Sequence, residues 1–117
     1  MSEAFETLFG LPRYAVERLR EVFAEWPGID RVLIYGSRAK GTHRYASDID
    51  LCIEGPDLTV VDLLRLENAI DDLLLPWRVD LALRHTIDDP ALTAHIDRVG
   101  CVFYEGWTAG NGPSPNR

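Results

Sequence analysis

The sequence predicts a single mixed α/β domain, in which a small mixed β-sheet is flanked by helices. Three observations support this fold class. The chain has 117 residues, which suits one domain. Hydrophobic residues make up 46% of it, enough to bury a core. Segments with helical and with strand-like hydrophobic spacing alternate along the chain, as expected for helices packed on a sheet.

The first expected helix begins near Pro12, because proline is favoured in the first turn, and it ends at Pro27–Gly28. Its apolar side chains recur every three or four residues and so share one face; they are Val16, Leu19, Phe23 and Trp26. A short apolar run between turn signals then predicts a buried strand over residues 31–35.

Gly36 breaks this strand, and Ser37 can cap a short helix that ends at Gly41. A polar loop follows over residues 42–47. Alternation of polar and apolar side chains predicts the next strand over residues 48–54, with its apolar side chains facing the core.

Thr59 and Asp62 have the spacing of a capping box, so a third helix is expected to begin there. Pro76 ends this helix, whose apolar positions are Leu63, Leu66, Ile70, Leu73 and Leu74. The run of residues 78–83 predicts another strand.

Asp89–Pro90 starts the final helix and Gly100 ends it. A last strand is expected over residues 101–104. The domain is therefore assigned to residues 1–105, and the Gly-, Pro- and Ser-rich residues 106–117 are expected to form a disordered tail.

Charge and composition exclude several classes of function. The net charge of −7 argues against a protein whose main task is to bind nucleic acid, since that needs a basic surface. No apolar run approaches the ~20 residues of a membrane span, and no signal peptide is recognised, so a cytoplasmic protein is expected. Cys52 and Cys101 are expected to be buried core residues without a disulfide.

The aspartates carry the strongest chemical signal. Asp48 and Asp50 lie two apart on an expected strand, so their carboxylates share one face and suit a hard divalent cation. Asp80 lies on a later strand. Alone, it fits an ion pair with Arg78 or Arg84 equally well, but beside Asp48 and Asp50 it would complete a two-metal site and accept a proton.

Gly36-Ser37 is the second half of this candidate site. Glycine at a strand end lets a phosphate approach the backbone, and the short helix that follows favours an anion. Arg38 is the best placed of three nearby cations to neutralise a triphosphate. Lys40 and Arg44 fit either that role or a solvated loop.

Other side chains receive no functional assignment. His43 is expected to be a solvated loop residue and His95 to face outward on the last helix. The tryptophans are expected to serve packing or to lie in the tail; they are Trp26, Trp77 and Trp107.

The order and spacing of the two halves are more specific than either half. The segments Gly36-Ser-Arg-Ala-Lys-Gly41 and Ser47-Asp-Ile-Asp-Leu51 resemble the polymerase-beta-type nucleotidyltransferase superfamily. More closely, the chain resembles the minimal nucleotidyltransferase (MNT) antitoxins of prokaryotes, and the resemblance covers roughly residues 12–104.

This resemblance implies an activity and a partner. MNT proteins pair with a helical HEPN ribonuclease toxin and transfer AMP from ATP to a tyrosine on it. By the same resemblance, Ser37 would hold the β- and γ-phosphates, Asp48 and Asp50 would hold two Mg²⁺ ions, and Asp80 would complete the second metal site and deprotonate the acceptor.

Several alternatives stay open at this point. The protein could neutralise a toxin by binding alone, or it could modify a small molecule with an acceptor domain supplied by another chain. Nucleic-acid polymerisation is disfavoured, because the sequence has neither an extension that would hold a template nor a basic groove. The nucleotide base, the acceptor hydroxyl and any homo-oligomer are not specified by the sequence.

Overall fold

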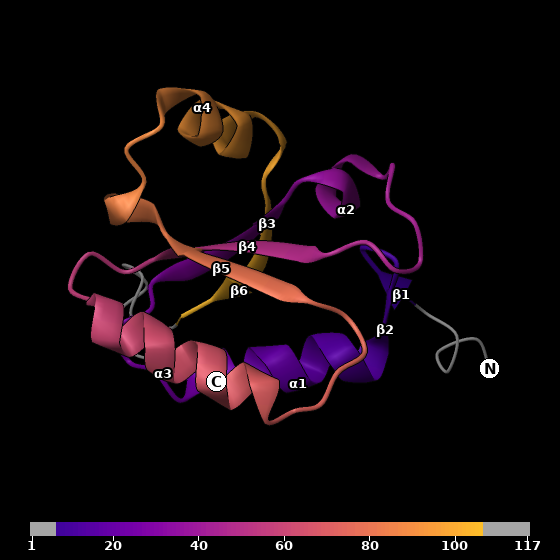
Figure 1. Ribbon diagram of the computed structural model, residues 1–117, viewed down its shortest axis with the longest axis horizontal. Helices are drawn as coiled ribbons and strands as arrows, with labels where there is room; N and C mark the ends of the chain where they lie inside the picture. The colour runs from indigo at the N-terminus through magenta and orange to yellow at the C-terminus, as the bar shows by residue number, and fades with distance from the viewer. Residues whose placement is uncertain (1–6, 107–117) are drawn as a thin grey trace.

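A computed structural model describes residues 7–106 and confirms the expected fold class, a mixed sheet with helices packed against it (Figure 1). The sheet has four strands in the order β5-β4-β3-β6. These strands are β3 (Arg31–Tyr35), β4 (Ile49–Glu54), β5 (Val79–Leu83) and β6 (Cys101–Glu105). Strand β3 pairs antiparallel with both β4 and β6, whereas β4 and β5 are parallel.

Helices cover both faces of this sheet. On one face lie α1 (Arg13–Ala24) and α3 (Val60–Asp71), and on the other lies α4 (Pro90–Val99) (Figure 1). The short helix α2 (Ser37–Lys40) follows the end of β3. The parallel pairing of β4 with β5 requires a crossover connection, and α3 provides it.

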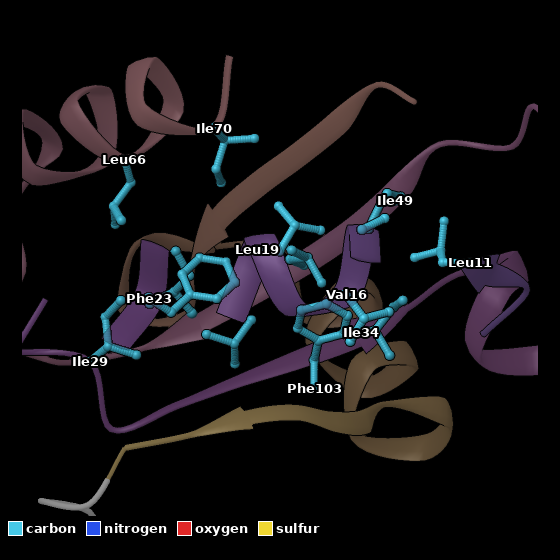
Figure 2. Close-up of a cluster of buried hydrophobic side chains, with 14 of the residues drawn as sticks. Leu11, Val16, Leu19, Phe23, Ile29, Ile34, Ile49, Leu66, Ile70 and Phe103 are labelled. Atoms are coloured by element: carbon cyan, nitrogen blue, oxygen red, sulfur yellow. The ribbon is translucent and has the colours of Figure 1, made fainter. Parts of the chain in front are cut away.

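The main core lies between the sheet and the α1/α3 layer. Helix α1 buries one stripe of side chains there, as its spacing predicts: Ala15, Val16, Leu19 and Phe23. Alternate side chains of β3 and β4 meet this stripe, and Ile34 and Ile49 point into it in Figure 2. A smaller cluster on the opposite face joins Leu33, Cys52 and Ile96 beneath α4. The sheet is therefore anchored on both sides around its central strands.

The third helix is shorter than predicted at its C-terminal end. Its start is confirmed, because the Thr59 hydroxyl accepts from the Asp62 N–H and the Asp62 carboxylate accepts from the Thr59 N–H. The helix ends at Asp71, so the assignment of Leu73 and Leu74 to it is wrong, although Leu73 still packs against the core. Leu74 has a φ of 56° and is 87% exposed. A residue at positive φ cannot continue a right-handed helix, so the chain has left the helix before Pro76.

Sequence reasoning also missed a short hairpin. Strands β1 (Thr7–Leu8) and β2 (Leu11–Pro12) pair antiparallel, with Phe9 and Gly10 both at positive φ in the turn. Such turns match the twist of a hairpin, but two-residue strands are too short to show a periodicity. A single 3-10 turn (Arg84–Thr86) follows β5 and was also not predicted.

The last described residue, Gly106, still belongs to the fold, since it is buried and its N–H donates to the Asp30 carbonyl (2.8 Å). The rest of the expected tail and Trp107 lie outside the described residues. Among residues 7–106, no helix has the length and apolar character needed to cross a bilayer. Both cysteines are free; Cys52 is buried, and Cys101 is half-buried rather than fully buried as expected.

Candidate active site

Three neighbouring strands bring the candidate residues into one row. In the register of the sheet, Asp50 on β4 lies beside Tyr35 on β3 and beside Asp80 on β5. In-register neighbours point to the same face of the sheet, here the face on which α4 packs. Asp48 immediately precedes β4 and is exposed. The pairing of β4 with β5 that the prediction required is present, and it places Asp50 beside Asp80.

The backbone at Gly36 packs directly against this row. Gly36 has φ 76° and ψ −154°, a conformation that side-chain-bearing residues rarely adopt. A Cβ at this position would also collide with Oδ2 of Asp50. The glycine therefore joins the two halves of the motif, because it lets the end of β3 turn while the Asp50 carboxylate lies against its Cα.

The turn leads straight into α2. Ser37 is its first residue and is partly exposed, so its hydroxyl and N–H lie at the helix N-terminus, one residue from the Gly36–Asp50 contact. The helix closes after one turn with a Lys40 N–H to Gly36 carbonyl bond of 3.1 Å. Gly41 then ends it at a φ of 79°.

The charges of Asp80 and Asp48 are close enough to affect the ionisation of Asp50. Burial raises the pKa of Asp50, and the negative charges of Asp80 and Asp48 raise it further, while His95 opposes the shift. Burial and then the charge of Asp50 raise the pKa of Tyr35 to about 12, so its hydroxyl stays protonated at physiological pH. An uncompensated cluster of this kind favours a bound cation.

The carboxylates are suitable ligands for Mg²⁺, but they do not by themselves form a complete metal site. Within residues 7–106, no three His, Cys, Asp or Glu side chains already enclose a position for a metal ion. Mg²⁺ does not need such an enclosure, since one or two carboxylates usually hold it together with substrate phosphates and water. Asp48 and Asp50 suit that mode, and the two-ion arrangement stays a prediction.

Arg38 does not lie where its predicted role requires. It is only 2% exposed, and its guanidinium nitrogens donate to backbone carbonyls rather than pointing at the carboxylates. This geometry gives no support to Arg38 as a triphosphate ligand. Lys40 and Arg44 are exposed, so they remain accessible to an anion.

Two histidines also differ from expectation. His95 does not face outward but packs edge-on against Tyr35, with ring centroids 6.2 Å apart. It lies three residues after Leu92, a spacing that places both on one helical face and offered a signal for this contact. His43 is not a freely solvated loop residue, since its Nδ1 is buried without a described partner and its ring fills the space above Gly10.

A glycine–serine turn packed on one carboxylate, with two further carboxylates close by, suits an enzyme that transfers phosphate-linked groups. Comparison with known proteins identifies the class more closely. The model of the family described as "Nucleotidyltransferase domain" matches residues 16–99, so the chain belongs to this family and is a nucleotidyltransferase.

Individual relatives agree with this assignment. A protein of Methanocaldococcus jannaschii named "Putative protein adenylyltransferase" is 29% identical over 79 residues, which cover 67% of this chain and 80% of the relative. A solved structure described as a "putative minimal nucleotidyltransferase" is 31% identical with a TM-score of 0.60, covering 76% of this chain and 89% of that one.

Structures of toxin–antitoxin complexes share the fold at lower identity. One, solved with AMP-PNP, has a TM-score of 0.65 at 20% identity and covers 77% of this chain and 73% of the other. Another holds a tri-AMPylated Shewanella oneidensis HEPN toxin and its MNT antitoxin, with a TM-score of 0.61 at 15% identity over 85% of this chain and 76% of that one.

Proposed function

We propose that this nucleotidyltransferase is the antitoxin of a HEPN/MNT pair and that it transfers AMP from ATP to a tyrosine hydroxyl of its partner toxin. The observation that carries the proposal is the row of Asp50 and Asp80 in register on adjacent strands, with Asp48 and the Gly36–Ser37 turn next to it. Support for a protein acceptor comes from the adenylyltransferase relative and from the fold shared with AMPylation complexes.

Each half of the site has a separate task in this proposal. Gly36 leaves room for the Asp50 carboxylate beside the turn, and Ser37 donates its hydroxyl and N–H to the β- and γ-phosphates. Asp48 and Asp50 hold Mg²⁺. Bound there, the metal supplies positive charge that offsets charge on the triphosphate.

Asp80 is the proton acceptor of the proposed reaction. The tyrosine hydroxyl oxygen attacks the α-phosphorus of ATP, and its proton passes to the Asp80 carboxylate. The new O–P bond forms as the bond between the α-phosphorus and the bridging oxygen breaks, and pyrophosphate leaves. Asp80 suits this role because it is exposed at the edge strand β5, next to Asp50 in the register.

The partner is proposed to be a HEPN-domain ribonuclease. The net charge of −7 suits docking on a basic nuclease, because opposite charges steer association. A second protein presenting a hydroxyl to the row of carboxylates fits this arrangement.

The direct test follows the two ends of ATP separately. The protein is incubated with Mg²⁺ and with the product of the adjacent gene, using ATP labelled at the α- or the γ-phosphate. We expect the α-label on a tyrosine of the partner and the γ-label in pyrophosphate. Transfer of the γ-label to the partner would indicate a kinase. No transfer of either label, together with complete inhibition of the partner's ribonuclease activity, would indicate an antitoxin that acts by binding alone.

A further inference from the structure

We propose that Arg38 is a positioning residue, which holds the loop of residues 42–48 and thereby sets where Asp48 lies in the metal site. The inference rests on the proposed function in one respect only, the assignment of Asp48 as a metal ligand. It concerns the loop that separates the two halves of the motif and so determines how they meet.

The contacts of Arg38 converge on this loop. Its Nε and Nη2 donate to the Ser47 carbonyl at 3.2 and 3.0 Å. Nη2 also donates to the carbonyls of Tyr45 (2.9 Å) and Arg44 (3.3 Å), and Nη1 donates to the Phe9 carbonyl (2.9 Å). Ser47 is the residue directly before Asp48. One side chain thus binds the loop at its exit and ties it to the N-terminal hairpin.

The way this charge is buried points to a specific role. Arg38 is the one buried charged side chain among the described residues, and it forms none of the ion pairs found there. Burying a cation is costly unless its donors are satisfied. A guanidinium offers five N–H groups in a fixed planar fork, so it can orient several carbonyls at once. An apolar residue would fill the same space without turning the carbonyls of the loop inward.

A second contact holds the other side of the loop. The Trp77 indole N–H donates to the Tyr45 carbonyl (2.9 Å), and Trp77 comes shortly before β5, which carries Asp80. The Tyr45 ring also packs edge-on against the indole, with centroids 5.8 Å apart. The loop is therefore held from α2 on one side and from the approach to β5 on the other. These contacts therefore set the position of Asp48 relative to α2 and to β5.

The closing experiment compares R38Q and R38K with the wild type and with a matched control, R20Q. Arg20 also donates to a backbone carbonyl, that of Phe103 (2.8 Å), but it lies on α1, whose core-facing side packs on the opposite face of the sheet. Two quantities are measured besides thermal stability. One is amide hydrogen exchange of the metal-free protein. The other is Mn²⁺ binding in the presence of ATP, followed by electron paramagnetic resonance.

We expect R38Q to speed exchange over residues 42–48 and to weaken Mn²⁺ binding by about tenfold or more, the scale seen when groups that orient metal ligands are removed. R38K should show loop exchange and Mn²⁺ affinity between those of R38Q and the wild type, because an ammonium keeps the charge but not the planar set of N–H donors. R20Q should lower the melting temperature without changing loop exchange or Mn²⁺ affinity. If R38Q does not fold, R38K and W77F carry the same comparison.

Folded R38Q with wild-type loop protection and wild-type Mn²⁺ affinity would overturn the inference and leave the proposed function intact. Wild-type protein that binds no Mn²⁺ with ATP would instead contradict the proposed function and the role of Asp48 together. The two failures are therefore distinguishable.

Discussion

Position 36 requires glycine for two reasons: the backbone conformation is unusual, and there is no space for a side chain. Its φ of 76° with ψ −154° strains any other residue, and a Cβ would displace the Asp50 carboxylate. We predict that G36A costs about 1–3 kcal/mol of stability and abolishes measurable AMP transfer. Chemical denaturation and a transfer assay measure the two effects.

Gly41 provides the control for this substitution. It also has a positive φ, 79°, but a Cβ there would meet open space. G41A should therefore cost about 1–2 kcal/mol from backbone strain alone and leave transfer intact in the folded protein. Equal loss of activity in both variants would mean that backbone strain, and not the contact with Asp50, explains the requirement for glycine.

We expect the ionised Asp50 carboxylate to oppose folding of the metal-free protein. Its pKa is raised in the fold by burial and by the nearby charges of Asp80 and Asp48, so ionisation at neutral pH works against folding. We predict that D50N stabilises the metal-free protein by about 0.5–1 kcal/mol at pH 7 while it abolishes transfer. Urea unfolding across a pH series measures this difference.

The stability difference between D50N and the wild type should increase with pH. Below the unfolded pKa of about 3.9, Asp50 is protonated in both states, so the advantage of D50N should vanish there. It should grow as the pH rises through the unfolded and then the folded pKa of Asp50. A D50N variant that is less stable than the wild type at pH 7 would contradict this account of the electrostatics.

Individual residues differ in how far the sequence could predict them. The shared face of Asp48 and Asp50 follows from strand periodicity, because residues two apart point the same way. The role of Arg38 could not be read in this way, since a cation beside a phosphate-binding turn and a cation buried under a loop have the same local sequence. Only the loop's path back over α2 shows that its carbonyls face the guanidinium.

Among the elements, α3 has the best-defined start, and its cap is separate from the site. Thr59 accepts from the Asp62 N–H at 3.3 Å, and the Asp62 carboxylate accepts from the Thr59 N–H at 2.8 Å. We predict that T59A lowers stability by about 1 kcal/mol, the usual cost of losing such a cap. Transfer by the folded variant should be unchanged, because α3 packs on the face opposite the carboxylates. Thermal unfolding and transfer kinetics measure both.

A fall in transfer rate well beyond the loss of folded protein in T59A would show that α3 couples to the site.

The elements also differ in how far the sequence could predict them. Each long helix and strand was predicted by its periodicity and its caps, but the hairpin of β1 and β2 and the end of α3 were not. Both depend on residues at positive φ, Phe9 and Leu74, which no local pattern announces.

At the scale of the whole molecule, strand order decides which aspartates lie side by side. Asp80 lies 30 positions after Asp50 in the sequence, and the parallel pairing of β4 with β5 places the two side by side. The alternation of helices and strands predicted the layers of this fold, but not the strand order β5-β4-β3-β6. The sequence alone therefore could not place Asp80 beside Asp50, and the role of Asp80 in the site stays a prediction.

The same arrangement separates a catalytic antitoxin from one that only binds. An acidic protein can cover a basic partner by charge complementarity alone, and such binding would not need carboxylates beside a glycine–serine turn. In the proposed reaction, catalysis depends on these particular carboxylates, whereas binding alone would depend on the overall charge. Two variants that lose the same number of negative charges, one within the candidate site and one away from it, distinguish catalysis from binding alone.

The measurement that tests the central claim most directly is therefore AMP transfer to the partner by three proteins: the wild type, D48N/D50N and the charge-matched control D57N/D71N, whose altered residues are both exposed. We predict transfer by the wild type and the control, and a rate at least about a thousandfold lower for D48N/D50N. Transfer by D48N/D50N at a rate close to that of the control would contradict the assignment of these carboxylates as the active site.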